Sequence, residues 1–115
     1  MQELDVNNHL LKEDLFEQFR AQLKKDFESA GISADFTDRL PTDFNALKTT
    51  VLAELEKIQG NSNLLPSLLY RVDISEQLLY QQAQKRGDVP FEQMLAELII
   101  KRVLQKVILK RTFSK

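Results

Sequence analysis

The residues best suited to bind a charged ligand lie near the C-terminal end of the chain, where no acidic residue follows Glu97. The basic residues of this stretch are Lys101, Arg102, Lys106, Lys110, Arg111 and Lys115. Arg102, Lys106 and Lys110 recur every four residues, so in a helix their side chains share one face. Such a face can neutralise the phosphates of a nucleic acid or lie on an anionic membrane surface. These three residues are therefore the candidate anion-binding set.

The same charges also have a structural interpretation. Residues 1–59 carry twelve acidic and seven basic side chains, a net charge of −5, whereas residues 60–115 carry five acidic and nine basic ones, a net charge of +4. Opposite charges can hold the two halves together, guide head-to-tail contact between subunits, or present a basic surface to an anionic partner. Basic residues are also favourable near a helix C-terminus. We favour neutralisation of one half by the other.

Few residues are suited to catalysis or metal binding. The chain has one His, no Cys and no glycine-rich phosphate loop. His9 and Glu13 stand four residues apart and could share a helix face as two metal ligands, but the sequence positions no third ligand. The acidic cluster of Glu13, Asp14 and Glu17 is typical of solvated helix surface. We expect no enzymatic activity, no cofactor and no metal site.

The first helix is predicted from apolar residues that recur every four positions. These residues are Leu11, Leu15, Phe19, Leu23 and Phe27. Asn7 is the expected N-terminal cap. Gly31 is suited to the left-handed conformation that follows a helix, which would bring Ile32 onto Phe27.

A loop over residues 33–41 is expected to tuck Phe36 and Leu40 under its neighbours. A second helix then begins at a Thr42 cap and ends at Gly60. Its apolar stripe consists of Phe44, Leu47, Val51, Leu55 and Ile58.

The third region allows two interpretations. Residues 70–74 alternate between apolar and polar types, which suits a short strand, and a strand followed by two helices has the order of a ribbon-helix-helix DNA-binding protein. Phosphates would repel the acidic side chains of Asp73, Asp88 and Glu92 in that arrangement. The preceding apolar run contains Pro66, which a first helical turn tolerates. We therefore expect a helix with a bend near Asp73.

The last helix is expected to begin near Asp88 and to continue to about Arg111. Its apolar residues occupy two nearly opposite faces. One face consists of Phe91, Leu95 and Leu98, and the other of Ile100, Val103, Leu104 and Val107. Because Ile108 and Leu109 point elsewhere again, three other helices would leave apolar surface uncovered. We expect Leu104, Ile108 and Leu109 to reach across to a second subunit.

These patterns predict one all-α domain over residues 1–115, a compact bundle of four to five helices with the long C-terminal helix as its central packing element. No apolar run is long enough to span a membrane, and the N-terminus resembles no secretion signal, so a cytoplasmic location is expected. The leading functional prediction is a non-enzymatic self-association or protein-interaction module that forms a homodimer and binds, in addition, a protein partner. The alternative is a nucleic-acid-binding adaptor that uses Arg102, Lys106 and Lys110.

Overall fold

Six α-helices and one 3-10 turn form the part of the chain that the computed structural model describes, which is residues 3–60 and 63–113. They are α1 (Glu3–Leu10), α2 (Glu13–Ser29), η1 (Asp35–Arg39), α3 (Phe44–Lys57), α4 (Leu64–Val72), α5 (Glu76–Lys85) and α6 (Phe91–Phe113). The all-α fold is confirmed. The radius of gyration is 13.6 Å, close to the value of about 13 Å expected for a compact chain of this length.

The first predicted helix is divided into two, which raises the number of helices to six. Helix α1 ends at Leu10 and α2 begins at Glu13. Leu11 lies in the break and is 73% exposed, so its predicted place on the apolar face is wrong. Val6 and Leu10 of α1 are buried instead. Spacing alone could not reveal the break, because the four-residue period continues across it.

Asn7 caps a different helix from the one predicted. It lies within α1, and its side-chain oxygen Oδ1 accepts a hydrogen bond of 2.8 Å from the backbone N–H of Phe44, at the start of α3. Asp43, rather than Thr42, is the N-cap residue of α3, and its carboxylate accepts a bond of 3.1 Å from the Ala46 N–H. Two N–H groups that the helix itself leaves without partners are thereby satisfied. The first contact also ties α1 to α3.

Replacement of Asn7 tests this tertiary cap. Asn7→Ala is expected to lower the free energy of unfolding by about 1 kcal/mol, because the Phe44 N–H loses its acceptor. Asn8→Ala is the matched control, since the Asn8 side chain is exposed on the same helix. Urea denaturation followed by circular dichroism measures both values. Equal stabilities of the two variants would contradict the cap.

The end of α2 follows the sequence-based prediction. Gly31 adopts a positive φ of 83°. The N–H of Ile32 then donates a hydrogen bond of 3.0 Å to the carbonyl of Phe27, which is the closing bond of a Schellman motif. Ile32 is buried. The Phe27 ring also contacts Phe36 edge-on at a centroid distance of 5.0 Å, so η1 is anchored against α2.

The predicted bend near Asp73 is a complete break between two helices. Asp73 adopts a left-handed conformation with φ of 72° at the end of α4. The hydroxyl of Ser75 then accepts a hydrogen bond of 3.1 Å from the Leu78 N–H and caps α5. Residues 70–72 are helical, so the strand interpretation and the ribbon-helix-helix order are wrong.

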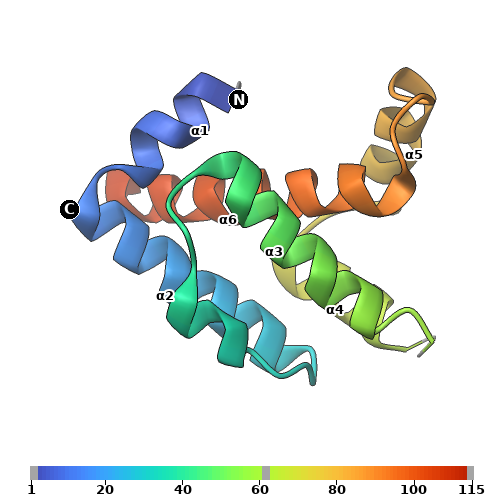
Figure 1. The fold of residues 1–115 in the computed structure, drawn as a ribbon, viewed down its shortest axis with the longest axis horizontal. Helices are drawn as coiled ribbons and strands as arrows, with labels where there is room; N and C mark the ends of the chain where they lie inside the picture. Colours follow the sequence, from blue (N-terminus) through green and yellow to red (C-terminus); the bar gives the residue numbers. More distant parts are fainter. Residues whose placement is uncertain (1–2, 61–62, 114–115) are drawn as a thin grey trace.

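Helix α6 is the central packing element, as predicted. Figure 1 shows it running behind α3, with α2 extending below it, α5 at its N-terminal end and the α1–α2 corner at its C-terminal end. It contacts α2, α3, α4 and α5. Its buried apolar residues are Met94, Leu95, Ala96, Ile99, Ile100, Val103, Leu104 and Val107. The second apolar face of α6 is thus covered within one chain, whereas only Leu95 of the first face is buried and Phe91 is 44% exposed. No helix in residues 3–60 and 63–113 has the length and apolar content needed to cross a membrane.

Candidate functional site

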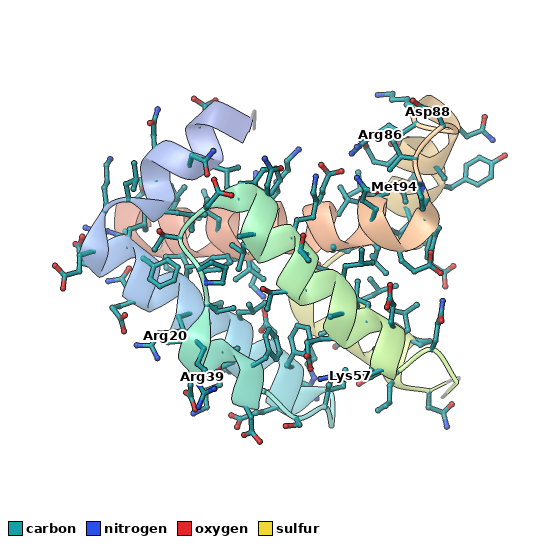
Figure 2. The ribbon with its side chains drawn as sticks, viewed as in Figure 1. Arg20, Arg39, Lys57, Arg86, Asp88 and Met94 are labelled. Carbon is teal, nitrogen blue, oxygen red and sulfur yellow. The ribbon has the colours of Figure 1, made fainter. Side chains whose placement is uncertain are left out.

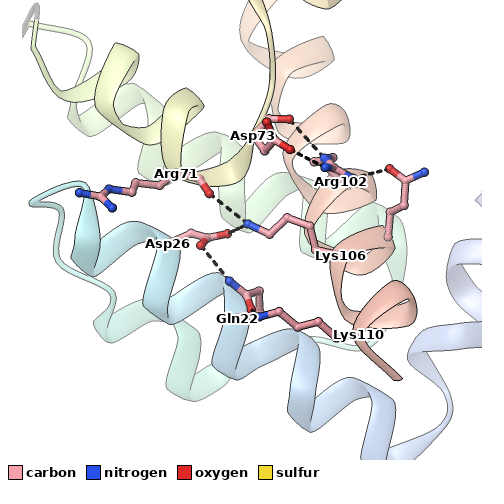
Figure 3. A network of polar contacts seen from close by, with 8 residues as sticks. Gln22, Asp26, Arg71, Asp73, Arg102, Lys106 and Lys110 are labelled. Atoms are coloured by element: carbon pink, nitrogen blue, oxygen red, sulfur yellow. Dashed lines mark hydrogen bonds and ion pairs between the residues drawn. The ribbon is translucent and has the colours of Figure 1, made fainter. Parts of the chain in front are cut away.

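The predicted anion-binding residues are engaged within the chain (Figure 3). Lys106 Nζ lies 2.7 Å from the carboxylate Oδ2 of Asp26 on α2 and also donates to the carbonyl of Arg71 on α4 at 3.0 Å. Arg102 reaches the carboxylate of Asp73 at 2.6 Å and its carbonyl at 3.2 Å. These basic side chains of α6 therefore form ion pairs with two carboxylates. They also donate hydrogen bonds to two backbone carbonyls at the end of α4.

Lys110 joins the same set of contacts through an amide. Its Nζ donates to the side-chain oxygen of Gln22 at 2.7 Å, and the Gln22 amide nitrogen donates to Asp26 Oδ1 at 2.9 Å. Both oxygens of Asp26 are thus occupied, while only 7% of its side chain and 16% of that of Lys106 are exposed. We call Gln22, Asp26, Lys106 and Lys110 the Lys106 network. It lies between α2 and α6, where an anionic ligand must compete with Asp26 for Lys106.

The other basic residues of this stretch differ in their contacts. Lys101 lies over the Phe44 ring at 5.8 Å from its centroid, and Arg111 lies 2.9 Å from the carboxylate of Asp14. Lys115 lies outside the described residues. No continuous row of free cations therefore forms along the described part of α6.

The contact with Arg111 changes the pKa of the Asp14 carboxyl. The hydrogen bond and positive charge of Arg111 lower the pKa of the Asp14 carboxyl below its ordinary value. The stabilisation from this contact is present above the ordinary pKa and is lost as the pH falls through the lowered pKa. Arg111→Gln is expected to raise the pKa of Asp14 toward its ordinary value in an NMR titration of the carboxyl carbon. Lys110→Gln is the control and should leave this pKa unchanged; the same pKa in wild type and Arg111→Gln would contradict the contact.

The three residues predicted to reach a second subunit do not form one exposed patch. Leu104 is 0% exposed within its own chain, so it belongs to the core and is not available to a partner. Ile108 is partly buried and packs against the core. Leu109 is 44% exposed. The expectation failed for Leu104 because the opposite faces of α6 are covered by different helices of the same chain.

A buried acidic group fixes the other end of α6. Glu97 lies 2.6 Å from Arg86 and 3.4 Å from Lys48 on α3, as measured between charged atoms. Figure 2 shows Arg86 and Met94 where the connection after α5 meets α6. No residue of α5 is fully buried, although Leu78 and Leu79 pack against the core, so this ion pair adds to a limited apolar attachment of the α5 end. Glu97 is paired with cations, which suits a structural role.

An apolar cleft lies where the end of α3, the start of α4 and the start of α6 meet. This α3–α4–α6 cleft has a volume of about 270 Å³. Its lining residues are Leu55, Ile58, Gln59, Leu65, Pro66, Phe91, Glu92 and Leu95. Phe91 is 44% exposed at its edge. The amide nitrogen of Gln59 donates to the Glu92 carboxylate at 2.7 Å and forms a polar rim.

Local sequence explains why this cleft forms at helix ends. Pro66 lies in the first turn of α4, where its missing N–H costs little, and Pro90 precedes the start of α6. Three helix ends meet there, and ends fill space less completely than the flanks of crossing helices. The spacing of Phe91 with Leu95 predicts an apolar face of the last helix. No local signal in the sequence places residues 65 and 66 opposite that face across a cleft.

No protein-family model matches the chain, no curated protein matches its sequence, and no solved structure matches its fold. Functional inference therefore depends on the contacts and surfaces of this structure.

His9 and Glu13 are not assembled into a metal site. His9 lies in α1 and Glu13 begins α2, on either side of the break between the helices. Within the described ranges, no group of three or more His, Cys, Asp or Glu side chains is arranged to hold a metal ion. The α3–α4–α6 cleft combines an apolar lining with the half-exposed side chain of Phe91.

Proposed function

We propose that the protein is a non-enzymatic, cytoplasmic self-association module that forms a homodimer through the α3–α4–α6 cleft. The observation that carries the proposal is that one surface holds both a half-exposed aromatic side chain, Phe91, and an apolar cavity beside it. In a two-fold dimer the same surface of each copy meets the other, so an interface must be self-complementary. Phe91 of each copy would enter the cleft of its partner.

The expected dimer is weak. Complete burial of a Phe side chain contributes roughly 1.5 to 3 kcal/mol, and Phe91 is already about half buried, so each ring gains only part of that amount. Leu65, which is only partly buried, adds contact area in the cleft, while the polar rim of Gln59 and Glu92 stays accessible to water. These contacts together contribute about 4 kcal/mol, so we expect a dissociation constant on the order of millimolar, which light scattering can detect by dilution.

Two matched variants test which end of α6 forms the interface. Phe91 and Leu109 are both 44% exposed and lie near opposite ends of this helix. Phe91→Asp is expected to give a folded monomer, because its carboxylate would be buried in an apolar cleft. Leu109→Asp is expected to remain a dimer. Solution mass by light scattering, with helicity by circular dichroism, is the measurement.

The other outcomes separate the alternatives. Monomeric Leu109→Asp with dimeric Phe91→Asp would place the interface at the C-terminal end of α6 and contradict the proposal. Wild-type protein that remains monomeric at several times the expected dissociation constant would also contradict it. In that case the cleft would be open to the apolar side chain of a different protein partner.

Nucleic-acid binding through Arg102, Lys106 and Lys110 is the alternative function. An anionic backbone would have to compete with Asp26 and Asp73 for two of these side chains. The alternative requires an affinity for duplex DNA or RNA that falls steeply with salt concentration. Fluorescence anisotropy with a labelled duplex at low and moderate salt is the test. Absent or salt-insensitive binding would contradict this function.

A further inference from the structure

A second cavity lies at the C-terminal end of α6. Figure 1 shows that this end of the helix meets the α1–α2 corner. We call it the α1–α2–α6 cavity, and its volume is about 210 Å³. Its lining residues are His9, Lys12, Leu15, Ile108, Arg111 and Thr112. The space is large enough for a group of several non-hydrogen atoms.

The lining of this cavity combines apolar and basic chemistry. Leu15 is buried and Ile108 is partly buried, and both belong to the packed region of the fold. Lys12 and Arg111 supply positive charge, and no lining residue is acidic. Such a combination of an apolar surface and a few polar groups is typical of a small-molecule site.

The basic groups have hydrogen-bonding capacity left for a ligand. Arg111 uses one terminal nitrogen, at 2.9 Å, for Asp14, whereas a guanidinium carries five N–H donors. Lys12 makes no ion pair with any residue in the described ranges. Nδ1 of His9 is shielded from solvent and has no hydrogen-bond partner in the same part of the chain. Asp14 is the acidic group that Arg111 contacts, and this ion pair neutralises its charge.

We propose that the α1–α2–α6 cavity binds a small carboxylate with an apolar tail. The carboxylate would lie between Lys12 and Arg111, where charge-assisted hydrogen bonds are strongest, and the tail would contact Leu15 and Ile108. The C-terminal residue of a peptide and a short-chain fatty acid share this chemistry. A bare phosphate fits less well, because it would leave the apolar part of the cavity unused. This site is independent of the proposed dimer interface.

A titration of the full chain with hexanoate tests the proposal, with hexanol as the uncharged probe of equal tail length. Two-dimensional ¹⁵N NMR is expected to show changes confined to residues 9–15 and 108–112. Hexanoate should bind at least about fivefold more tightly than hexanol, because only the carboxylate reaches the two cations. Equal affinities of the two probes, or changes located elsewhere, would overturn the proposal.

A matched pair of charge variants makes the test specific. Lys12→Gln is expected to weaken hexanoate binding by about fivefold and to leave hexanol binding unchanged. Lys85→Gln removes a positive charge from α5, at the other end of α6, and should leave the hexanoate affinity unchanged. Equal weakening by both substitutions would indicate attraction by net charge alone and would overturn the site.

Peptides separate the two sources of the carboxylate. A short peptide that ends in leucine is compared with the same peptide carrying a C-terminal amide. Binding of the free acid but not of the amide, at the same residues as hexanoate, supports recognition of a protein C-terminus. Binding of hexanoate without either peptide supports a free fatty acid. Failure of all three probes overturns the proposal and leaves the dimer proposal untouched.

Discussion

Asp26→Ala is expected to lower the free energy of unfolding by about 3 kcal/mol, because it removes one partner of a buried ion pair. The substitution would leave Lys106 with the carbonyl of Arg71 but without its counter-ion. Because only 16% of the Lys106 side chain is exposed, water can replace the carboxylate only in part. The amide of Gln22 would lose its acceptor as well.

A double variant separates the cost of leaving Lys106 without a counter-ion from the contribution of the ion pair itself. Asp26→Leu with Lys106→Met removes both charges and fills the site with apolar atoms, so its stability is expected within about 1 kcal/mol of wild type. Glu17→Ala removes an exposed partner of Arg20 and should cost less than about 1 kcal/mol. Urea denaturation gives all three values. A cost below about 1 kcal/mol for Asp26→Ala would show that the Lys106 network does not stabilise the fold.

Leu104→Ala is expected to destabilise the protein by about 3 kcal/mol without changing its association. Leu104 has no exposed surface in the chain, and its truncation would leave a cavity between α6 and the helices that cover it. The sequence-based expectation differs, because an interfacial Leu104 would weaken the dimer rather than the subunit. The variant therefore tests whether α6 is covered within one chain.

Leu109→Ala is the matched control for that experiment. Leu109 is 44% exposed on the same helix, so its truncation is expected to cost less than about 1 kcal/mol. Thermal or urea unfolding is combined with light scattering at one protein concentration. A Leu104→Ala variant that is as stable as wild type and yet monomeric would restore Leu104 to the interface.

Local signals in the sequence are sufficient where the structure depends on local contacts. Gly31 and Ile32 predict the end of α2, because a Schellman motif involves only residues close in the chain. Four-residue spacing similarly locates the buried face of α2 through Leu15, Phe19 and Leu23. The predicted length of the last helix agrees to within a few residues with Phe91–Phe113.

Tertiary contacts account for the predictions that failed. The sequence predicts that Asn7 caps the first helix, but its side-chain oxygen accepts a hydrogen bond from the N–H of Phe44, which is 37 residues away in the chain. Leu11 fits the apolar period and is nevertheless exposed, because the chain turns between α1 and α2. Nothing local distinguishes these positions from residues that follow the pattern.

The charge pattern of the sequence shows which half of the chain is acidic and which is basic, but it does not show which side chains pair with each other. Opposite net charges in the two halves agree with the contact of Lys106 with Asp26, which are 80 residues apart. Spacing places Lys106 and Lys110 on one face, yet it could not show that Gln22 and Asp26 would lie opposite them. The basic face of α6 is thus recognisable from sequence, whereas its neutralisation depends on how α2 packs.

Contacts between copies at Phe91 test the proposed dimer most directly. In a mixed sample of ¹³C-labelled and unlabelled protein, isotope-filtered NMR detects only contacts between different chains. We expect cross-peaks from the Phe91 ring of one copy to the methyl groups of Leu65 of the other, because Leu65 is only partly buried within its own chain. Contacts between copies that involve Leu109 instead, or none at a concentration at which the protein is dimeric, would contradict self-association through the α3–α4–α6 cleft.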